Sequence, residues 1–265
     1  MTRFCVCASV FSNFEYFIEK GNVLFGSSTP KMTKPHDTIP MDYYLFTNIP
    51  TEKLVNHVPE QWQIILIPNS PDPNIQNQTQ LSRYFKFQLH HYFSQQNKHD
   101  YDWIIYLDHY LHLDPTVDWN KIVAPVVEKI SDTELALIQT FHKDQFNSIY
   151  QEAQMIISGC ADSSENVNKA LQYLQNFNKT ISLNQPIVYR ENWLFLYSPK
   201  HTPTIEHFDL FWKHYLDKNY GTKRDQPLWN YLLHYREPKV YSTVMNLIQY
   251  IRNEGIVNKY GNKFS

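Results

Sequence analysis

Charged side chains of this chain stand on one face of an expected helix and at the ends of expected strands. Arg83 and Lys86 lie three residues apart, on one face of a helix, where an arginine fork and a lysine point charge can bind a diphosphate. The same spacing also fits a solvated helix face. Asp108 ends the apolar run 101–107, and with His109 it could hold a divalent cation, or it could accept hydrogen bonds from a sugar or ribose.

Three more residues have side chains suited to chemistry. His142 follows the next apolar run and could bind phosphate or donate a proton. The same position also fits a histidine of a surface loop with no functional role. Glu152 lies among apolar neighbours, so it is either paired or functional. Asp225 precedes Pro227, a good first-turn residue, and is therefore either a helix N-cap or a carboxylate that holds a sugar hydroxyl or acts as a base.

The hydrophobic pattern predicts the elements that position these side chains. We expect strands over 4–10, 42–48, 61–67, 101–107, 135–140 and 187–197, the last interrupted at 190–192. We expect helices over 14–20, 81–96, 118–130, 148–158, 167–177, 205–216, 227–234 and 243–252. Strands alternate with helices through the first 140 residues, which predicts an α/β fold with a mostly parallel sheet and a more helical second half. Ligands of such sheets bind beyond the carboxyl ends of strands, where Asp108 would lie.

Composition excludes several classes of protein. The chain of 265 residues suits one domain, and a net charge of -2 gives no basic face for nucleic acid. Six glycines in all leave no glycine-rich phosphate loop, so the Rossmann and P-loop fingerprints are absent and most dehydrogenases and NTPases are excluded. Three cysteines form no disulfide framework, and neither a signal peptide nor an apolar run of about 18 residues is present. We therefore expect a soluble, cytoplasmic protein.

The order of several motifs carries a resemblance to a known family. The motifs are 42–48 (DYYLFTN), Arg83 with Lys86 and His90, 103–108 (WIIYLD), His142 with 149–153 (IYQEA), and Trp212 with 224–226 (RDQ). In this order the chain resembles a glycosyltransferase-like domain family, formerly of unknown function, with plant pectin- and mucilage-related members and bacterial members. More distantly it resembles the nucleotide-sugar-binding fold called GT-A. The match runs from about residue 4 to about residue 236.

The resemblance implies one GT-A-like domain over 1–265. Its nucleotide-binding half would be 1–140, its donor-sugar and acceptor half 141–240, and its C-terminal helix and tail 241–265. It further implies roles for single residues: Asp225, Gln226 and Glu152 at the reaction centre; Arg83, Lys86, Asp108, His142, Arg224 and Asp42 at the donor and its nucleotide; Trp212 and Tyr110 at the acceptor.

A divalent cation, Mn²⁺ or Mg²⁺, is the cofactor that the resemblance implies. Its ligands would be Asp108, with His109 or His234 as replacement ligands. Tyr110 stands where the family usually has a short polar residue, so the sequence lacks the conventional metal site with two carboxylate ligands.

The resemblance predicts a glycosyltransferase that moves a sugar from a nucleotide-sugar to a glycan, protein or small-molecule acceptor. Two alternatives stay open. One is a catalytically degenerate nucleotide- or carbohydrate-binding module of the same fold. The other is a hydrolase with paired acids, which needs two carboxyl groups at a definite separation that sequence does not give.

Overall fold

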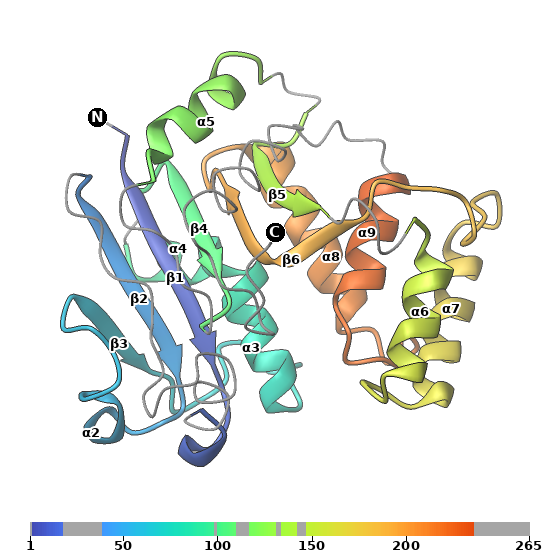
Figure 1. Cartoon of the computed structure of the whole chain (residues 1–265), viewed down its shortest axis with the longest axis horizontal. Coiled ribbons are helices and arrows are strands. Elements are labelled where there is room, and N and C mark those ends of the chain that lie inside the picture. Colours follow the sequence, from blue (N-terminus) through green and yellow to red (C-terminus); the bar gives the residue numbers. More distant parts are fainter. Residues whose placement is uncertain are drawn as a thin grey trace, which may run out of the picture.

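A single mixed sheet of six strands organises the protein (Figure 1). The computed structural model describes residues 2–17, 39–97, 100–109, 117–130, 134–141 and 147–235. The strand order is β3-β2-β1-β4-β6-β5. The strands are β1 (Phe4–Val10), β2 (Met41–Thr47), β3 (Trp62–Leu66), β4 (Trp103–Leu107), β5 (Leu137–Phe141) and β6 (Arg190–Tyr197).

Strands β1 to β4 run parallel, and the chain order reverses between β1 and β4. Strand β6 pairs antiparallel with both β4 and β5, so it joins the second half of the chain to the sheet of the first. In open α/β sheets, ligands bind outside the carboxyl ends of the strands at such a reversal. The carboxyl ends of β1 and β4 are therefore the place where a site is expected.

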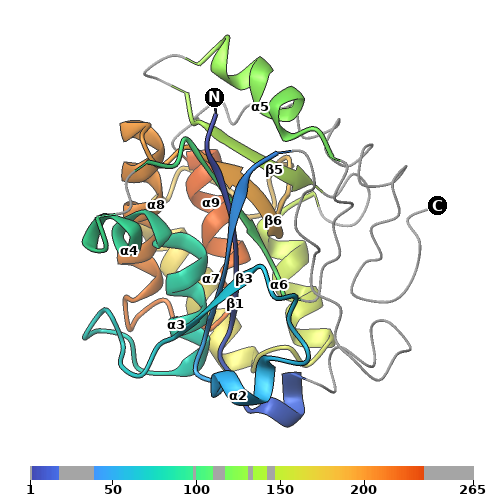
Figure 2. The ribbon, with the colours of Figure 1, turned by 90° about the vertical axis from the view of Figure 1, so that its left-hand side faces the viewer.

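The described helices lie on both faces of the sheet (Figure 2). Their bounds are α2 (Thr51–Leu54), α3 (Gln78–Phe87), α4 (Leu89–Gln95), α5 (Trp119–Val127), α6 (Ile149–Ser158), α7 (Ser164–Phe177), α8 (Thr202–Tyr215) and α9 (Gln226–Tyr235). Helix starts follow local side-chain chemistry, because Asn77, Asp118, Ser148 and Ser163 each accept a hydrogen bond from the backbone N–H three residues on.

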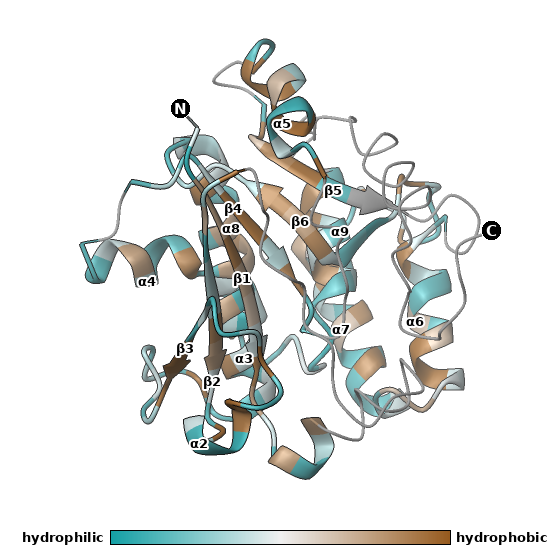
Figure 3. Ribbon diagram, turned by 60° about the vertical axis from the view of Figure 1, so that its left-hand side comes forward, coloured by the Kyte–Doolittle hydropathy of each residue, from teal (hydrophilic) through white to brown (hydrophobic). Residues whose placement is uncertain are grey.

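Alternation along the strands divides the core into two layers. In β1 every residue is buried; Cys5 and Cys7 face the layer under α3, α4, α8 and α9, while Phe4 and Val6 face the layer under α2 and α5. Figure 3 shows the consequence, with strands that are mostly hydrophobic and with hydrophilic and hydrophobic residues on α6 and α7. The parallel pairing of β1 with β2 and β4, and of β2 with β3, confirms the expected mostly parallel α/β sheet.

Two expectations about local structure were wrong, and one short helix was not predicted. The helix expected over 81–96 is two helices, because the backbone at Gln88 is not helical and α4 begins after it. Strand β6 begins at Arg190, so it includes 190–192, where an interruption was expected, and leaves out 187–189, where strand was expected. Its pairing with β5 is irregular at this end. The four-residue helix α2 has too few residues to show a period, and it was not predicted.

The helix expected over 243–252 and the tail 241–265 lie outside the described residues. Among the helices of the described ranges, none has the length and apolar character to cross a membrane.

Candidate functional site

Helix α3 turns Arg83 and Lys86 toward the carboxyl ends of the central strands. The helix packs on β1, where the Ser9 hydroxyl donates to the Ser82 carbonyl over 3.2 Å. The Arg83 side chain is 19% exposed and that of Lys86 only 4% exposed. The interpretation of a solvated helix face is therefore wrong for this pair, and two cations lie in a mostly buried setting that needs compensating charge.

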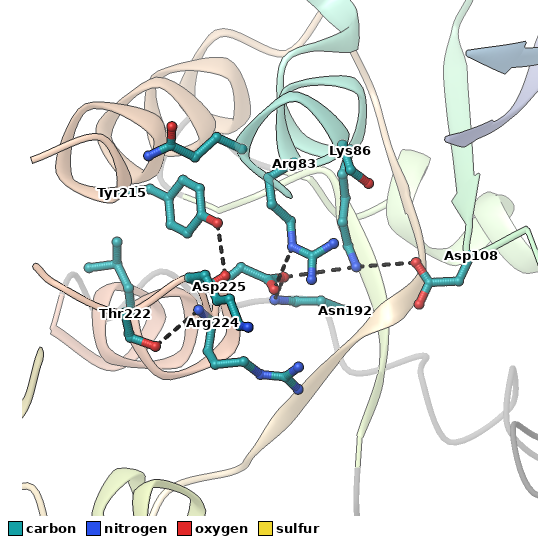
Figure 4. A network of polar contacts seen from close by, with 12 residues as sticks. Arg83, Lys86, Asp108, Asn192, Tyr215, Thr222, Arg224 and Asp225 are labelled. Carbon is teal, nitrogen blue, oxygen red and sulfur yellow. Dashed lines mark hydrogen bonds and ion pairs between the residues drawn. The ribbon is translucent and has the colours of Figure 1, made fainter. Parts of the chain in front are cut away.

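Asp225 supplies much of that charge (Figure 4). Its Oδ1 accepts from Arg83 Nε at 2.7 Å, its Oδ2 accepts from Asn192 Nδ2 at 3.1 Å, and Lys86 Nζ lies 3.8 Å from the same Oδ2. Within the described chain, none of the side-chain hydrogen bonds of Asp225 goes to the backbone of α9. The interpretation of Asp225 as an N-cap alone is thus replaced by a carboxylate that links α3, β6 and α9.

Asp108 continues the same row of charges. It follows β4, and its Oδ1 lies 3.5 Å from Lys86 Nζ and accepts from the Tyr106 hydroxyl at 3.0 Å. The Ser9 hydroxyl lies 3.3 Å from that of Tyr106. Lys86 is consequently shared by the carboxylates of Asp108 and Asp225, which are 117 positions apart in the chain.

The pKa values of these groups follow from burial and from the neighbouring charges. Burial raises the pKa of Asp225, but Arg83, Lys86 and Arg224 outweigh it and hold that pKa well below its usual range. Burial lowers the pKa of Lys86 further than Asp108 and Asp225 raise it. The ionised form of Asp225 is thus strongly favoured at neutral pH.

A tightly bonded loop presents Arg224 and Asp225 between α8 and α9. The Tyr215 hydroxyl donates to the Lys223 carbonyl and the Tyr220 hydroxyl to the Arg224 carbonyl, each over 2.9 Å. Gly221 has a φ of +84°, and a Cβ there would lie 2.9 Å from the Cβ of Lys169, so the turn requires glycine. The backbone of the loop, and not only its side chains, fixes the position of the carboxylate.

Asn192 reaches Asp225 because β6 is irregular at this point. The register to β5 jumps from the pair Gln139–Phe195 to the pair Thr140–Glu191. Gln139 donates from Nε2 to Asn192 Oδ1 at 3.1 Å, which orients the amide so that its Nδ2 faces Asp225. Bulges often re-aim a side chain in this way next to functional sites.

Glu152 lies close to the same cluster without a strong partner. It is buried in α6, and among the described residues its Oε2 and the Nε of Arg224 have no hydrogen-bond partner. Burial, reinforced by Glu191, raises the pKa of Glu152 well above its usual range, against the opposing charge of Arg224. A raised pKa favours the protonated carboxyl group, which can donate a hydrogen bond or a proton.

The structure does not bring three expected residues to this cluster. Asp42 lies near the start of β2, at the amino edge of the sheet, and accepts from the Tyr101 hydroxyl. Trp212 is 7% exposed; its Nε1 donates to Asp72 Oδ2 at 2.9 Å, so little of its ring can stack on an acceptor. His234 follows Asp225 by nine residues, about 14 Å along α9.

Of the four remaining expected residues, the structure describes His109 and Gln226. His109 is stacked on Phe17 with ring centroids 5.6 Å apart, and burial lowers its pKa to about 4. Gln226 opens α9 beside Asp225, and its carbonyl accepts from Asn230 Nδ2. His142 and Tyr110 lie outside the described residues.

Two residues of the cluster were not predicted from the sequence. Asn192 belongs to the polar stretch 190–192 at the start of the otherwise apolar strand β6, and that polarity was its signal. Tyr106 precedes Asp108 by two residues, and alternation puts both on one face of the strand.

A divalent cation at Asp108 does not fit the described residues. Lys86 already places a positive charge 3.5 Å from Asp108 Oδ1. Among the described residues, the grouping of histidine, cysteine or acid that has ligand spacing is His90, His91 and Asp209, which lies elsewhere. We therefore assign no step to a metal at this site.

Comparison with known proteins leaves the family open. No protein-family profile matches the chain, and no curated protein matches it with significance.

Proposed function

We propose that this protein is a glycosyltransferase that uses a nucleotide-sugar donor and transfers the sugar to a carbohydrate, protein or small-molecule acceptor. The observation that carries the proposal is the buried charge cluster of Arg83, Lys86, Asp108 and Asp225 outside the carboxyl ends of the central strands. The motif resemblance to GT-A-like proteins and the switch-point position of the cluster point the same way.

In this proposal the cations bind the diphosphate of the donor. Arg83 uses Nε for Asp225, and its terminal nitrogens make no hydrogen bond to the described part of the chain, so they can face phosphate oxygens. Lys86 contributes a fixed point charge, and Arg224 a second guanidinium. Charge that builds on the leaving diphosphate would then be stabilised without reorganisation of the protein.

The acids bind the sugar in the same proposal. Asp225 would accept hydrogen bonds from sugar hydroxyls, and Gln226, the next residue, would lie near the anomeric carbon. The protonated carboxyl group of Glu152 would donate to a hydroxyl or to the acceptor. Asp108 would bind ribose or sugar hydroxyls.

A second candidate function is a nucleotide- or carbohydrate-binding module without turnover. The observation in its favour is that the charges already satisfy one another, with Arg83 on Asp225 at 2.7 Å and Lys86 between Asp108 and Asp225. Such a network can serve structure alone.

Titration calorimetry with UDP-sugars and GDP-sugars, with and without Mn²⁺, tests the shared claim of nucleotide-sugar binding. We expect binding that does not need Mn²⁺ and that Arg83→Ala weakens, whereas Arg3→Ala, a surface arginine paired with Asp100, leaves it unchanged. Absence of binding for every nucleotide-sugar tested contradicts the glycosyltransferase and the nucleotide-binding module, and leaves only a module that binds carbohydrate. Binding without transfer or donor hydrolysis selects the module.

A further inference from the structure

Two adjacent histidines and one aspartate converge at a place that the proposed transfer reaction does not use. His90 and His91 begin α4, and Asp209 projects from α8. The Nε2 atoms of His90 and His91 lie 3.2 Å and 2.9 Å from the same atom, Asp209 Oδ1. All three ligand atoms lie within 4.8 Å of one another.

The two nitrogen–oxygen spacings are close to those of a tetrahedral metal site. Zinc binds histidine nitrogen at about 2.0–2.1 Å and carboxylate oxygen at about 2.0–2.2 Å, so neighbouring ligand atoms of a tetrahedron lie about 3.4 Å apart. Each of the two N–O separations needs to open by only a few tenths of an ångström to reach that value, about 3.4 Å. Imidazole nitrogen with one carboxylate is a ligand set that suits zinc and other transition metals.

The surroundings have the features of a built metal site. The Nδ1 of His90 lies 3.4 Å from the hydroxyl of the buried Tyr197, and ligating histidines generally bond through their second nitrogen in this way. His90 is buried, while His91 and Asp209 are 48% and 42% exposed, so an ion can enter from solvent. A cavity lined by both histidines opens beside the cluster and can admit a water as fourth ligand.

The cluster lies toward the amino edge of the sheet, whereas the charged site lies outside its carboxyl edge. Its cavity includes Tyr101, which precedes β4, and Lys200, which follows the antiparallel β6, so it lies at the amino edge of the sheet. Asp108 is seven residues after Tyr101, about 23 Å along an extended strand. Lys200 does not oppose a cation strongly, because its ammonium group donates to Asp102 at 2.7 Å.

We propose that His90, His91 and Asp209 bind one Zn²⁺ ion, or a transition metal of the same class, with water as the fourth ligand. The ion joins the start of α4 to the middle of α8 and therefore fixes two helices that cover the same layer of the core. Because the ion binds the folded chain through residues from two helices, it also stabilises the fold.

Zinc binding by the full-length chain without an affinity tag tests this proposal, with Zn²⁺ in competition against a chromophoric chelator. We expect one Zn²⁺ per chain, and we expect bound Co²⁺ to give the visible absorption of a tetrahedral nitrogen and oxygen site. His91→Ala and Asp209→Asn should each weaken Zn²⁺ binding at least about 100-fold, and Tyr197→Phe about 10- to 100-fold.

The control variant is His57→Ala, on the opposite layer, where His57 contacts Phe14. It should bind Zn²⁺ as the wild type does. The half-exposed positions of His91 and Asp209 let both variants fold, which far-ultraviolet circular dichroism can verify. The proposal is overturned if the wild type binds no stoichiometric Zn²⁺, or if His91→Ala and Asp209→Asn bind it with unchanged affinity. Since nucleotide-sugar titrations do not involve these residues, failure here leaves the proposed transfer reaction untouched.

Discussion

Asp225 is the residue on which the charged site depends most. One carboxylate meets Arg83, Asn192 and Lys86, which come from α3 and β6. Removal of one partner from a buried ion pair is costly because the opposite charge stays buried without compensation. In Asp225 a structural role and the proposed role at the sugar therefore coincide.

Asp225→Asn should abolish sugar transfer and lower the free energy of unfolding by about 3–5 kcal/mol at neutral pH. The pKa of Asp225 is depressed in the folded state, so its stabilisation is present above about pH 4 and is lost as the pH falls below that value. Urea denaturation of both proteins at pH 7 and pH 3 measures the difference. Asp100→Asn, at an exposed pair with Arg3, is the control and should cost less than about 1 kcal/mol. A variant as stable as the wild type at pH 7 contradicts the geometry of the cluster.

Glu152→Gln should have the opposite dependence on pH. Burial raises the pKa of Glu152 in the folded state. Above about pH 4.3 the unfolded chain therefore ionises more readily than the folded chain, and the free energy of unfolding falls as the pH rises. The amide cannot ionise, and the variant should therefore gain stability relative to the wild type between pH 5 and pH 8. Thermal midpoints across that range measure the gain. Parallel curves for the two proteins would show that Glu152 ionises in the folded state as easily as in the unfolded state.

At this scale the sequence revealed the charged residues but not how they pair. Arg83 and Lys86 are recognisable by type and by their spacing on one helix face, and Asp108 and Asp225 by their positions at the ends of elements. Their mutual contacts depend on the packing of α3, β6 and α9, which no local pattern encodes. Asn192 was missed because its role depends on a jump in strand register.

At the scale of elements, Gln88 decides how α3 ends and α4 begins. Its Nε2 donates to the carbonyl oxygens of Phe87 and Phe208, both over 3.1 Å, in a buried setting. Apolar spacing continues across the junction, so periodicity predicted one helix, and the break follows from a tertiary contact instead. Strand positions were predicted better, because buried strands are short apolar runs with polar flanks.

Gln88→Ala should lower the free energy of unfolding by about 1–3 kcal/mol, because two buried carbonyl groups lose a donor. Gln95→Ala, at the exposed end of α4, should change it by less than about 0.5 kcal/mol. Chemical denaturation of both variants gives the comparison. Equal effects at the two positions would argue against a specific junction at Gln88.

At the scale of the molecule, Trp229 ties the second half of the chain to the sheet. It is fully buried, contacts Phe87 and Phe195, and donates from Nε1 to Gln139 Oε1 at 2.9 Å. The layered α/β architecture followed from the order of expected elements. The antiparallel insertion of β6 did not, since strand direction and neighbour are set by packing.

Trp229→Ala should therefore cost about 3–5 kcal/mol. Met155→Ala, at a side chain of α6 that is 56% exposed, is the matched control and should have little effect. Thermal unfolding followed by circular dichroism measures both. A loss below about 1 kcal/mol at Trp229 would contradict its place in the shared core.

The most direct test of the central claim is a crystal structure of the chain soaked with UDP and with GDP, each in the presence of Mn²⁺. We expect diphosphate density outside the carboxyl ends of β1 and β4, in contact with the guanidinium groups of Arg83 and Arg224. Nucleotide density at another place, or none at saturating concentration, would contradict the assignment of this cluster as a nucleotide-sugar site.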